Sequence, residues 1–162
     1  MYNHAPNNYK CPLCLAINEI ENEDTMMKQA DIVYKDKYVT VAINSKFVGN
    51  NPGHVIIFPT QHYENLYDLP DEIANHVIQL SKHISLAIKN LRSCDGVMIL
   101  QNNEPASGQH AFHYHMHIFP RFENDNISTN MDNAKVSDPK ERIPFSVSLK
   151  KYLKDNQTIN QF

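Results

Sequence analysis

The sequence contains no hydrophobic run long enough to cross a membrane. No segment approaches the roughly 18 consecutive apolar residues that a transmembrane helix requires. The first residues, MYNHAPNNYKCPLC, also lack the basic-then-apolar order of a secretory signal. Cysteine is scarce as well: there are three, an odd number. These absences predict a cytoplasmic protein without membrane contact or structural disulfides.

An excess of positive charge is also missing. The formal net charge is −3 at pH 7 and the pI is near 6.3, whereas a surface that coats a polynucleotide is normally basic. We therefore expect no polynucleotide partner, although a pocket for one small phosphate compound needs only a few donors. With 162 residues, 41% hydrophobic and 20% charged, the composition is that of one globular domain with a buried core.

Strand-like and helix-like patterns succeed one another along the chain. Residues 31–44, DIVYKDKYVTVAIN, contain two β-rich runs around a polar turn and predict a hairpin. The short apolar runs HVIIFP at 54–59 and GVMIL at 96–100 each predict a strand. Between these runs, apolar residues recur at steps of three and four over residues 71–91, which predicts one long amphipathic helix.

The composition changes after Arg121. Residues 122–142 are polar and poor in apolar side chains, which predicts a mobile segment, and 144–154 are expected to form a short helix. We therefore divide the chain into a domain at 1–121 and a polar C-terminal extension at 122–162. The order of the elements predicts an α+β fold, with an antiparallel sheet of about five strands, one long helix and a short N-terminal helix.

Three histidines alternate with apolar residues in FHYHMHI, residues 112–118. Because successive side chains of a strand point to opposite faces, His113, His115 and His117 are expected to share one face while the apolar residues enter the core. Neighbouring imidazoles on that face lie about 6.5–7 Å apart, so two of them can touch one phosphate. A surface strand that uses histidine merely as its polar residue is the plainer alternative, and three histidines in register disfavour it.

Imidazole is well suited to phosphorus chemistry. With a pKa ordinarily near 6.5, a good part of it is neutral and nucleophilic at pH 7. Attack on an α-phosphorus through a covalent phosphoramidate replaces one difficult displacement by two easier ones, and a neighbouring imidazolium can protonate the leaving atom. No catalytic cofactor is needed. A zinc ion bound by all three histidines is an alternative that strand geometry leaves open.

The segment GQHAFHYHMHIFPR, residues 108–121, resembles the signature of the histidine triad (HIT) superfamily, in which His-x-His-x-His is followed by apolar residues. The preceding features agree in order: a strand pair, a Gly-His pair before the next strand, a long helix, a further strand and a polar loop. The resemblance covers about residues 10–122. It implies a HIT-like fold and a nucleotidyl hydrolase or transferase. The implied substrates are dinucleoside polyphosphates, nucleoside phosphoramidates or acyl-adenylates.

The resemblance also implies roles for individual residues. His115 corresponds to the nucleophile, which is transiently nucleotidylated, and His117 to the third triad member, which contacts the phosphate and assists the leaving group. His54 matches an additional active-site histidine near the nucleophile. The family is commonly homodimeric, with the sheet continuing or the long helices packing across a twofold axis, so the resemblance implies a homodimer.

Substrate contacts are implied at three further positions. Asn44 occupies the place of a residue that binds ribose hydroxyls, and Asn102 and Gln109 match positions that hold the phosphate or the leaving portion. The sequence departs from the family pattern in two places. The loop that follows Asn44 is slightly longer than usual, and His110 stands where many members have Ser or Thr; the role of His110 is left open.

The motif Cys11-Pro-Leu-Cys14 is a weak metal signal by itself, because a chance pair or a redox motif would explain it equally well. Some bacterial HIT members resemble this sequence further, and in them such a pair joins two histidines around structural zinc. The resemblance implies that Cys11, Cys14, His62 and His113 form a closed, non-catalytic Cys2His2 site. Such a site would tie the N-terminal helix to the histidine strand.

Two other classes of function stay open at this point. One is a nucleotide-binding adaptor or regulatory protein whose catalysis is incidental. The other is a three-histidine zinc hydrolase, which would lose activity in a chelator. A covalent nucleotide on His115, formed without catalytic metal, would separate the HIT chemistry from the zinc hydrolase.

Overall fold

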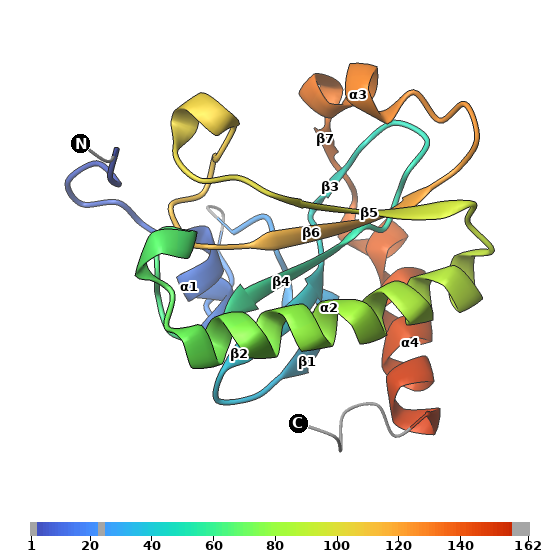
Figure 1. Ribbon diagram of the computed structural model, residues 1–162, viewed down its shortest axis with the longest axis horizontal. Coiled ribbons are helices and arrows are strands. Elements are labelled where there is room, and N and C mark those ends of the chain that lie inside the picture. Colours follow the sequence, from blue (N-terminus) through green and yellow to red (C-terminus); the bar gives the residue numbers. More distant parts are fainter. Residues whose placement is uncertain (1–2, 23–24, 157–162) are drawn as a thin grey trace.

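The structure, a computed structural model, describes residues 3–22 and 25–156. Its centre is an antiparallel sheet of five strands in the order β1-β2-β4-β6-β5 (Figure 1). The strands are β1 (Ile32–Lys35), β2 (Val39–Ile43), β4 (Val55–Pro59), β5 (Gly96–Gln101) and β6 (Met116–Arg121). The α+β class and the antiparallel sheet predicted from the sequence are confirmed.

Shorter elements surround this sheet. Strand β3 (Lys46–Phe47) pairs with β7 (Lys135–Val136) in a separate two-stranded ribbon. The helices are α1 (Pro12–Ile17), α2 (Asp71–Arg92), α3 (Ile127–Asn130) and α4 (Pro139–Asp155). Single 3-10 turns are η1 (Gln29–Asp31), η2 (Leu66–Asp68), η3 (Pro105–Ser107) and η4 (Met131–Asn133). None of the helices in the described part of the chain is both long and apolar enough for a membrane span.

Helices α2 and α4 cover one face of the sheet (Figure 1). The apolar stripe of α2 that the sequence predicts is buried there, with Val77, Leu80 and Ile84 at 1% exposure or less. Alternate residues of the strands meet it, and each fully buried Val, Leu or Ile contributes about 1.5–3 kcal/mol. This packing fixes which side chains of the strands are left for the opposite face.

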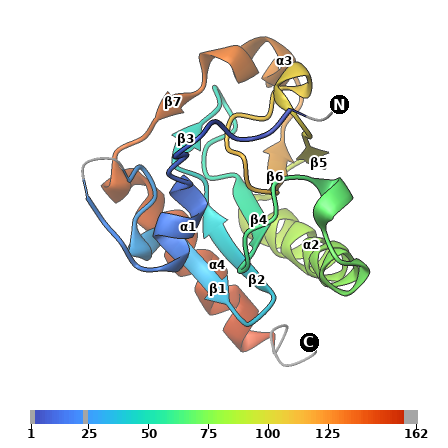
Figure 2. The same ribbon diagram turned by 90° about the vertical axis from the view of Figure 1, so that its left-hand side faces the viewer.

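The opposite face is covered only in part. Helix α1 packs on Ala42, Ile56 and Phe58 of β2 and β4, and it lies beside these strands in Figure 2. A smaller apolar cluster of Val48, Phe119 and Ile127 lies at the other end of this face. The histidines that concern us lie on this face.

Residues 122–156 are folded in the structure, although the composition of residues 122–142 predicts a mobile segment. They form α3, η4, β7 and α4, and α4 is longer than the predicted helix at 144–154. Leu149 and Leu153 of α4 enter the main core. The fully buried Arg142 donates from Nε to Asp31 Oδ1 at 2.8 Å. The buried Arg142 thus anchors this segment, which composition alone could not indicate. The domain boundary at residue 121 stays a prediction.

The regular part of the histidine strand begins later than predicted. Strand β6 starts at Met116, so His113 and His115 lie in the segment that leads into it. The predicted alternation still holds in its buried half, because Tyr114, Met116 and Ile118 belong to the main core. Phe112 does not join them: it is half-buried and packs edge-on against the ring of Tyr9.

Candidate functional site

A cavity of about 600 Å³ opens on the sheet face that α2 and α4 leave free. Four of the residues singled out from the sequence line it: Asn44, His54, Asn102 and His117. They come from the end of β2, the start of β4, the loop after β5, and β6. Segments far apart in the sequence therefore converge here because the sheet order places β4 and β6 side by side.

His54 is the most deeply placed of these residues, at 1% exposure. Its Nε2 lies 2.7 Å from Asn44 Nδ2 and 3.2 Å from His117 Nδ1. Its ring stacks on Phe119, with centroids 4.0 Å apart. Burial lowers the pKa of His54 to about 3, and the charge that His115 can take adds to this effect. At neutral pH His54 is therefore an uncharged imidazole that orients Asn44 and His117.

His115 has a defined tautomer. Its Nδ1 lies 2.7 Å from the carbonyl oxygen of His113, and a carbonyl can only accept, so Nδ1 holds the hydrogen. The Nε2 of a neutral His115 is then left with a free lone pair. The ring lies beside that of His117, with centroids 4.9 Å apart. Burial lowers the pKa of His115 and, to a greater extent, that of His117.

The loop after β5 supplies the other side of the cavity. Asn102 and the exposed His110 both line it. Gln109 does not: its Oε1 accepts from the Glu104 N–H at 2.6 Å and its Nε2 donates to the Glu64 carbonyl at 2.8 Å. Both ends of this buried amide are thus engaged by backbone groups. Gln109 shapes the loop, and His110 is the residue of the pair that faces the cavity.

The four residues of the expected metal site lie together. Ligand atoms of Cys11, Cys14, His62 and His113 all fall within 4.8 Å of one another. Cys11 Sγ is 3.3 Å from His113 Nδ1, and Cys14 Sγ is 3.2 Å from His62 Nδ1. Helix α1 brings the two thiols, because Cys11 is its N-cap and Cys14 lies one turn on. The fully buried His113 therefore turns toward α1 and away from the cavity.

These distances fit a tetrahedral ion. A zinc ion about 2.3 Å from sulfur and about 2.05 Å from nitrogen separates a sulfur from a nitrogen ligand by about 3.6 Å. The His113 Nε2 donates to the Pro59 carbonyl at 3.0 Å, which fixes its tautomer and leaves Nδ1 with the lone pair that a metal needs. The Nδ1 of His113 faces the cysteines and its Nε2 binds the Pro59 carbonyl. The three triad imidazoles therefore do not converge on one point, which disfavours a zinc ion bound by all three histidines.

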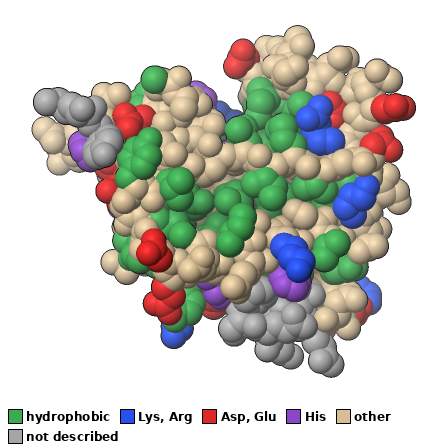
Figure 3. Space-filling view, in the orientation of Figure 1, with side chains coloured by type: hydrophobic (Ala, Val, Ile, Leu, Met, Phe, Trp, Pro, Cys, Tyr) green, Lys and Arg blue, Asp and Glu red, His purple; other side chains and the backbone are tan. Residues whose placement is uncertain are grey.

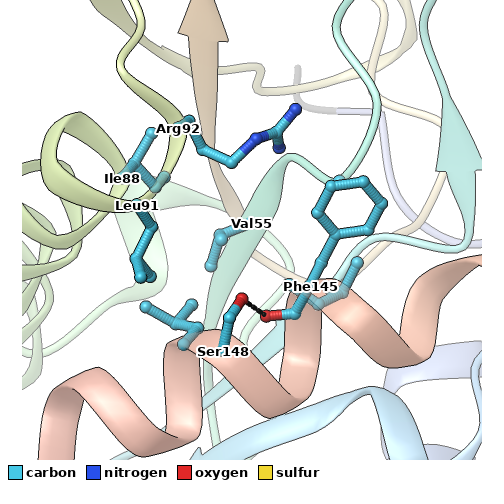
Figure 4. A pocket seen from close by; sticks show the side chains of 9 residues that line it. Val55, Ile88, Leu91, Arg92, Phe145 and Ser148 are labelled. Atoms are coloured by element: carbon cyan, nitrogen blue, oxygen red, sulfur yellow. Dashed lines mark hydrogen bonds between the residues drawn. The ribbon is translucent and has the colours of Figure 1, made fainter.

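Helix α4 supports the cavity from behind. The ring of Phe145 lies against Gly53, where an added Cβ would come within 2.5 Å of it, and Gly53 has φ +71°. Figure 4 shows Arg92 of α2 beside this ring, 4.6 Å from its centroid, at a hollow of about 20 Å³. Arg92 Nη1 also donates to the Pro52 carbonyl at 2.8 Å. Two helices thus hold the backbone that leads directly into His54.

A second support lies beyond β6 and was missed in the sequence. The Asp125 carboxylate accepts two hydrogen bonds from Arg121, at 2.7 and 2.9 Å, and one from Asn51 Nδ2 at 2.7 Å. The Arg121 guanidinium holds the pKa of Asp125 well below its usual range, although burial opposes this. No local pattern indicates such a network, because its members are brought together by the turn after β6 and the loop before β4.

The sequence was compared with models of known protein families and with known proteins. The model of the HIT domain family matches residues 25–124. An uncharacterised HIT-like protein of Saccharolobus solfataricus is 34% identical over 113 residues, which are 70% of this chain and 77% of that protein. Adenylylsulfatase HINT3 of Arabidopsis thaliana is 30% identical over 112 residues, 69% of this chain and 54% of that protein.

Solved structures agree on the fold. A zinc-bound histidine triad family protein from Mycobacterium smegmatis superimposes with a TM-score of 0.72 at 22% identity, covering 93% of this chain and 97% of that one. Plasmodium falciparum diadenosine triphosphate hydrolase gives 0.69 at 19% identity, covering 96% and 90%. The HIT-like fold implied by the triad residues is thereby confirmed.

Proposed function

The chain belongs to the HIT domain family, and from that premise we propose that it is a nucleotidyl hydrolase or transferase that cleaves a bond to a nucleotide α-phosphorus. The observation that supports this most directly is the hydrogen bond from His115 Nδ1 to the His113 carbonyl, at 2.7 Å. It leaves the Nε2 of His115 as the nucleophilic atom, on a ring that lies beside that of His117, and His117 lines the cavity together with His54 and His110.

In the first step the Nε2 lone pair of His115 forms a bond to the α-phosphorus, and the bond from phosphorus to the leaving oxygen or nitrogen breaks. His117 donates a proton to the leaving atom. The anionic phosphate of a bound nucleotide favours the protonated form of that imidazole. His54 accepts from His117 Nδ1 and so keeps the ring of His117 turned toward the phosphate.

In the second step a water oxygen attacks the same phosphorus, the phosphorus–nitrogen bond to His115 breaks, and the water proton goes to His117. The nucleotide leaves and both imidazoles regain their starting states. If an acceptor other than water attacks, the same site acts as a transferase. Asn44 is the proposed contact for the ribose hydroxyls and Asn102 for the phosphate; Gln109 contributes by holding the loop, since its own amide is engaged.

We also propose that Cys11, Cys14, His62 and His113 hold structural zinc. The donor set and spacing support it, and one relative with the same fold is described as zinc-bound. Zinc there would link α1 to the segment before β6. It would fix the carbonyl of His113, to which His115 donates, without touching the substrate.

A cytoplasmic homodimer completes the proposal. Strand β5 is an edge of the sheet, and an edge with apolar residues around it is suited to pairing with a second copy. Figure 3 shows hydrophobic side chains in a band across the face that Figure 1 presents. Exposed apolar residues of α2 and β5 are Ile78, Leu86, Leu91 and Ile99. Light scattering of the protein should give the mass of two chains, and Ile99→Lys should shift it toward one.

The experiment that tests the chemistry is to map a covalent adduct. Wild-type protein and His117→Ala are incubated with a nucleotide substrate labelled in the α-phosphate, quenched in base and digested. We expect label on His115, with more of it in the variant because the second step is slowed. Label on His113, or an active enzyme that never acquires label, would show that the assignment is wrong.

A further inference from the structure

Asn44 lies at the point where the chain leaves the main sheet. Strand β2 ends at Ile43, and Lys46 begins the separate ribbon of β3 and β7. Asn44 and Lys46 both line the cavity. We call residues 44–46 the Asn44 turn. Whatever holds this turn sets the direction of two side chains at the proposed substrate site.

The main sheet holds the Asn44 turn from one side, through His54. The N–H of Asn44 donates to the His54 carbonyl at 2.9 Å, and the Nδ2 of Asn44 lies 2.7 Å from His54 Nε2. No hydrogen bond to the Oδ1 of Asn44 is found among the described residues. This oxygen is therefore left to accept a hydrogen bond from a ligand.

The C-terminal segment holds the Asn44 turn from the other side, where the carbonyl oxygen of Ser45 is the acceptor. The N–H of Ser137 donates to it at 3.0 Å, and the Ser137 hydroxyl donates to it at 3.1 Å. Ser137 directly follows β7, which lies beside β3 in Figure 2. Both serines are buried, so these bonds are shielded from water.

Arg142, near the start of α4, fixes Ser137 in turn. Its Nη1 donates to the Ser137 carbonyl at 2.6 Å and lies 3.5 Å from the Ser45 carbonyl. Its Nη2 donates to the Met26 carbonyl at 3.0 Å, and its Nε donates to Asp31 at 2.8 Å. One guanidinium thus ties the segment before β1, the Asn44 turn and α4 together. Acceptors in several directions require the planar fork of donors that arginine alone supplies.

The ion pair of Arg142 and Asp31 adds little to stability by itself. Both residues are fully buried, and the removal of two charges from water offsets most of their attraction. The effect of such a pair is to fix direction, because a buried charge with all its partners in place tolerates one geometry. Since those partners include the residue that holds the Asn44 turn, the geometry that is fixed includes that of a cavity side chain.

We propose that Arg142, acting through Ser137, is a positioning residue for Asn44 and thereby for the recognition of the ribose hydroxyls. This inference rests on the proposed function, in which Asn44 is the ribose contact, and adds to it a residue of the C-terminal segment. Arg142 is not among the residues that line the cavity, so it acts without touching the substrate. Without its guanidinium, the Oδ1 of Asn44 is no longer held toward the hydroxyls.

The test compares the binding of adenosine 5′-monophosphate (AMP) with that of 2′,3′-dideoxy-AMP, which lacks both ribose hydroxyls, by calorimetry. The wild type should bind AMP about fivefold more tightly, the factor for about one net hydrogen bond. Arg142→Met should lower this ratio to less than twofold, and so should Asn44→Ala. Arg142→Lys should lower it as well, because one ammonium cannot serve acceptors in several directions. Its charge should nevertheless keep the unfolding temperature above that of Arg142→Met.

The matched control is Leu153→Ala, because Leu153 is a buried residue of the same helix and belongs to the main core. This variant should lower the unfolding temperature through the cavity that it leaves and keep the ratio of the wild type. A ratio that both Arg142 variants leave unchanged, or that Leu153→Ala lowers equally, would overturn the proposal. If Arg142→Met does not fold, the ratio of Arg142→Lys decides.

A wild type that binds neither nucleotide would show that the proposed function is wrong. Equal binding of the two, or a ratio that Asn44→Ala leaves unchanged, would show that Asn44 is not the ribose contact. In each case the positioning is measured without nucleotide, by the heteronuclear NOE of the Asn44 side-chain amide nitrogen. This amide should be rigid in the wild type and in Leu153→Ala, and mobile in Arg142→Lys. Equal values in all three proteins would overturn the positioning role as well.

Discussion

The imidazole of His115 donates its Nδ1 hydrogen to the carbonyl oxygen of His113 at 2.7 Å. This bond joins two sites. The side chain of His113 belongs to the cysteine–histidine cluster, while its carbonyl sets the tautomer of the proposed nucleophile. Because a carbonyl of the segment before β6 orients the ring, the position of the His115 Nε2 depends on what holds His113. The cluster and the cavity are thus parts of one arrangement.

Replacing the nucleophile should abolish turnover. His115→Ala removes Nε2 and is expected to lower kcat by several orders of magnitude, about 10⁴-fold or more, as loss of a nucleophile does. The unfolding temperature should change little, since the side chain of His115 is only partly buried and is not part of the main hydrophobic core. A steady-state assay with His83→Ala, a half-exposed histidine of α2, as control would check this. Retention of a tenth of the wild-type kcat would rule out His115 as the nucleophile.

Metal content can be tested with the cysteines themselves. Cys14→Ser should remove bound zinc and lower the unfolding temperature, because a closed Cys2His2 site contributes directly to folding free energy. Cys94→Ser is the matched control, since Cys94 is buried elsewhere and is not part of the cluster. Elemental analysis of protein prepared without chelator should find about one zinc per chain in the wild type and the control. A wild type without zinc, with a stability that chelator leaves unchanged, would contradict the site.

The contact between Gly53 and Phe145 should be intolerant of a methyl group. The methyl group that Gly53→Ala adds would clash with the ring, and alanine disfavours the φ of +71° at this position. We therefore expect a loss of about 1–3 kcal/mol in the free energy of unfolding. Activity should fall as well, because the displaced backbone carries His54. Gly96→Ala is the control: its Cβ would lie 3.8 Å from the nearest atom, an ordinary contact. Urea unfolding of both variants measures the difference, and equal losses would show that Phe145 exerts no constraint.

Acid should destabilise the protein partly through His54. Its pKa is about 3 in the folded chain, against about 6.5 when unfolded. The folded state therefore stays neutral while the unfolded state binds a proton below pH 6.5. The stability that His54 contributes is fully present above that pH and is lost as the pH falls toward 3, at up to about 1.4 kcal/mol per pH unit.

His54→Gln should reduce this slope of unfolding free energy against pH by up to that amount between pH 6 and 4, whereas His83→Gln should leave it as in the wild type. Denaturant titrations at a series of pH values measure the slope. An unchanged slope in His54→Gln would mean that His54 is protonated in the folded protein too.

Local patterns in the sequence were sufficient for the main elements. The alternation around His113, His115 and His117 predicted which side chains enter the core, and the apolar repeat of residues 71–91 predicted α2, because both periods reflect one buried face. The place at which β6 begins could not be read in this way. The regular ladder needs partners on β4 and β5, and His113 is drawn toward the cysteines instead.

The segment after Arg121 shows the limit of composition. Its polar residues predicted a mobile tail, yet Arg142 is fully buried against Asp31, and Asp125 is bound by Arg121 and Asn51. Each pair joins residues that are distant in the sequence or separated by a turn. A charged side chain becomes an internal anchor only when the fold brings its partner, so composition counts it as solvent-exposed.

The sequence by itself therefore predicted the fold class, the family and the candidate residues for the chemistry, since each of these depends on local spacing and residue type. Tertiary structure decided how that set is divided. It turned His113 toward Cys11 and Cys14, set His115 by a backbone carbonyl, and withdrew Gln109 into the loop. The physical reason is that hydrogen-bond partners and apolar neighbours of a side chain come from whichever strands and helices the core packs together, and no local pattern contains that information.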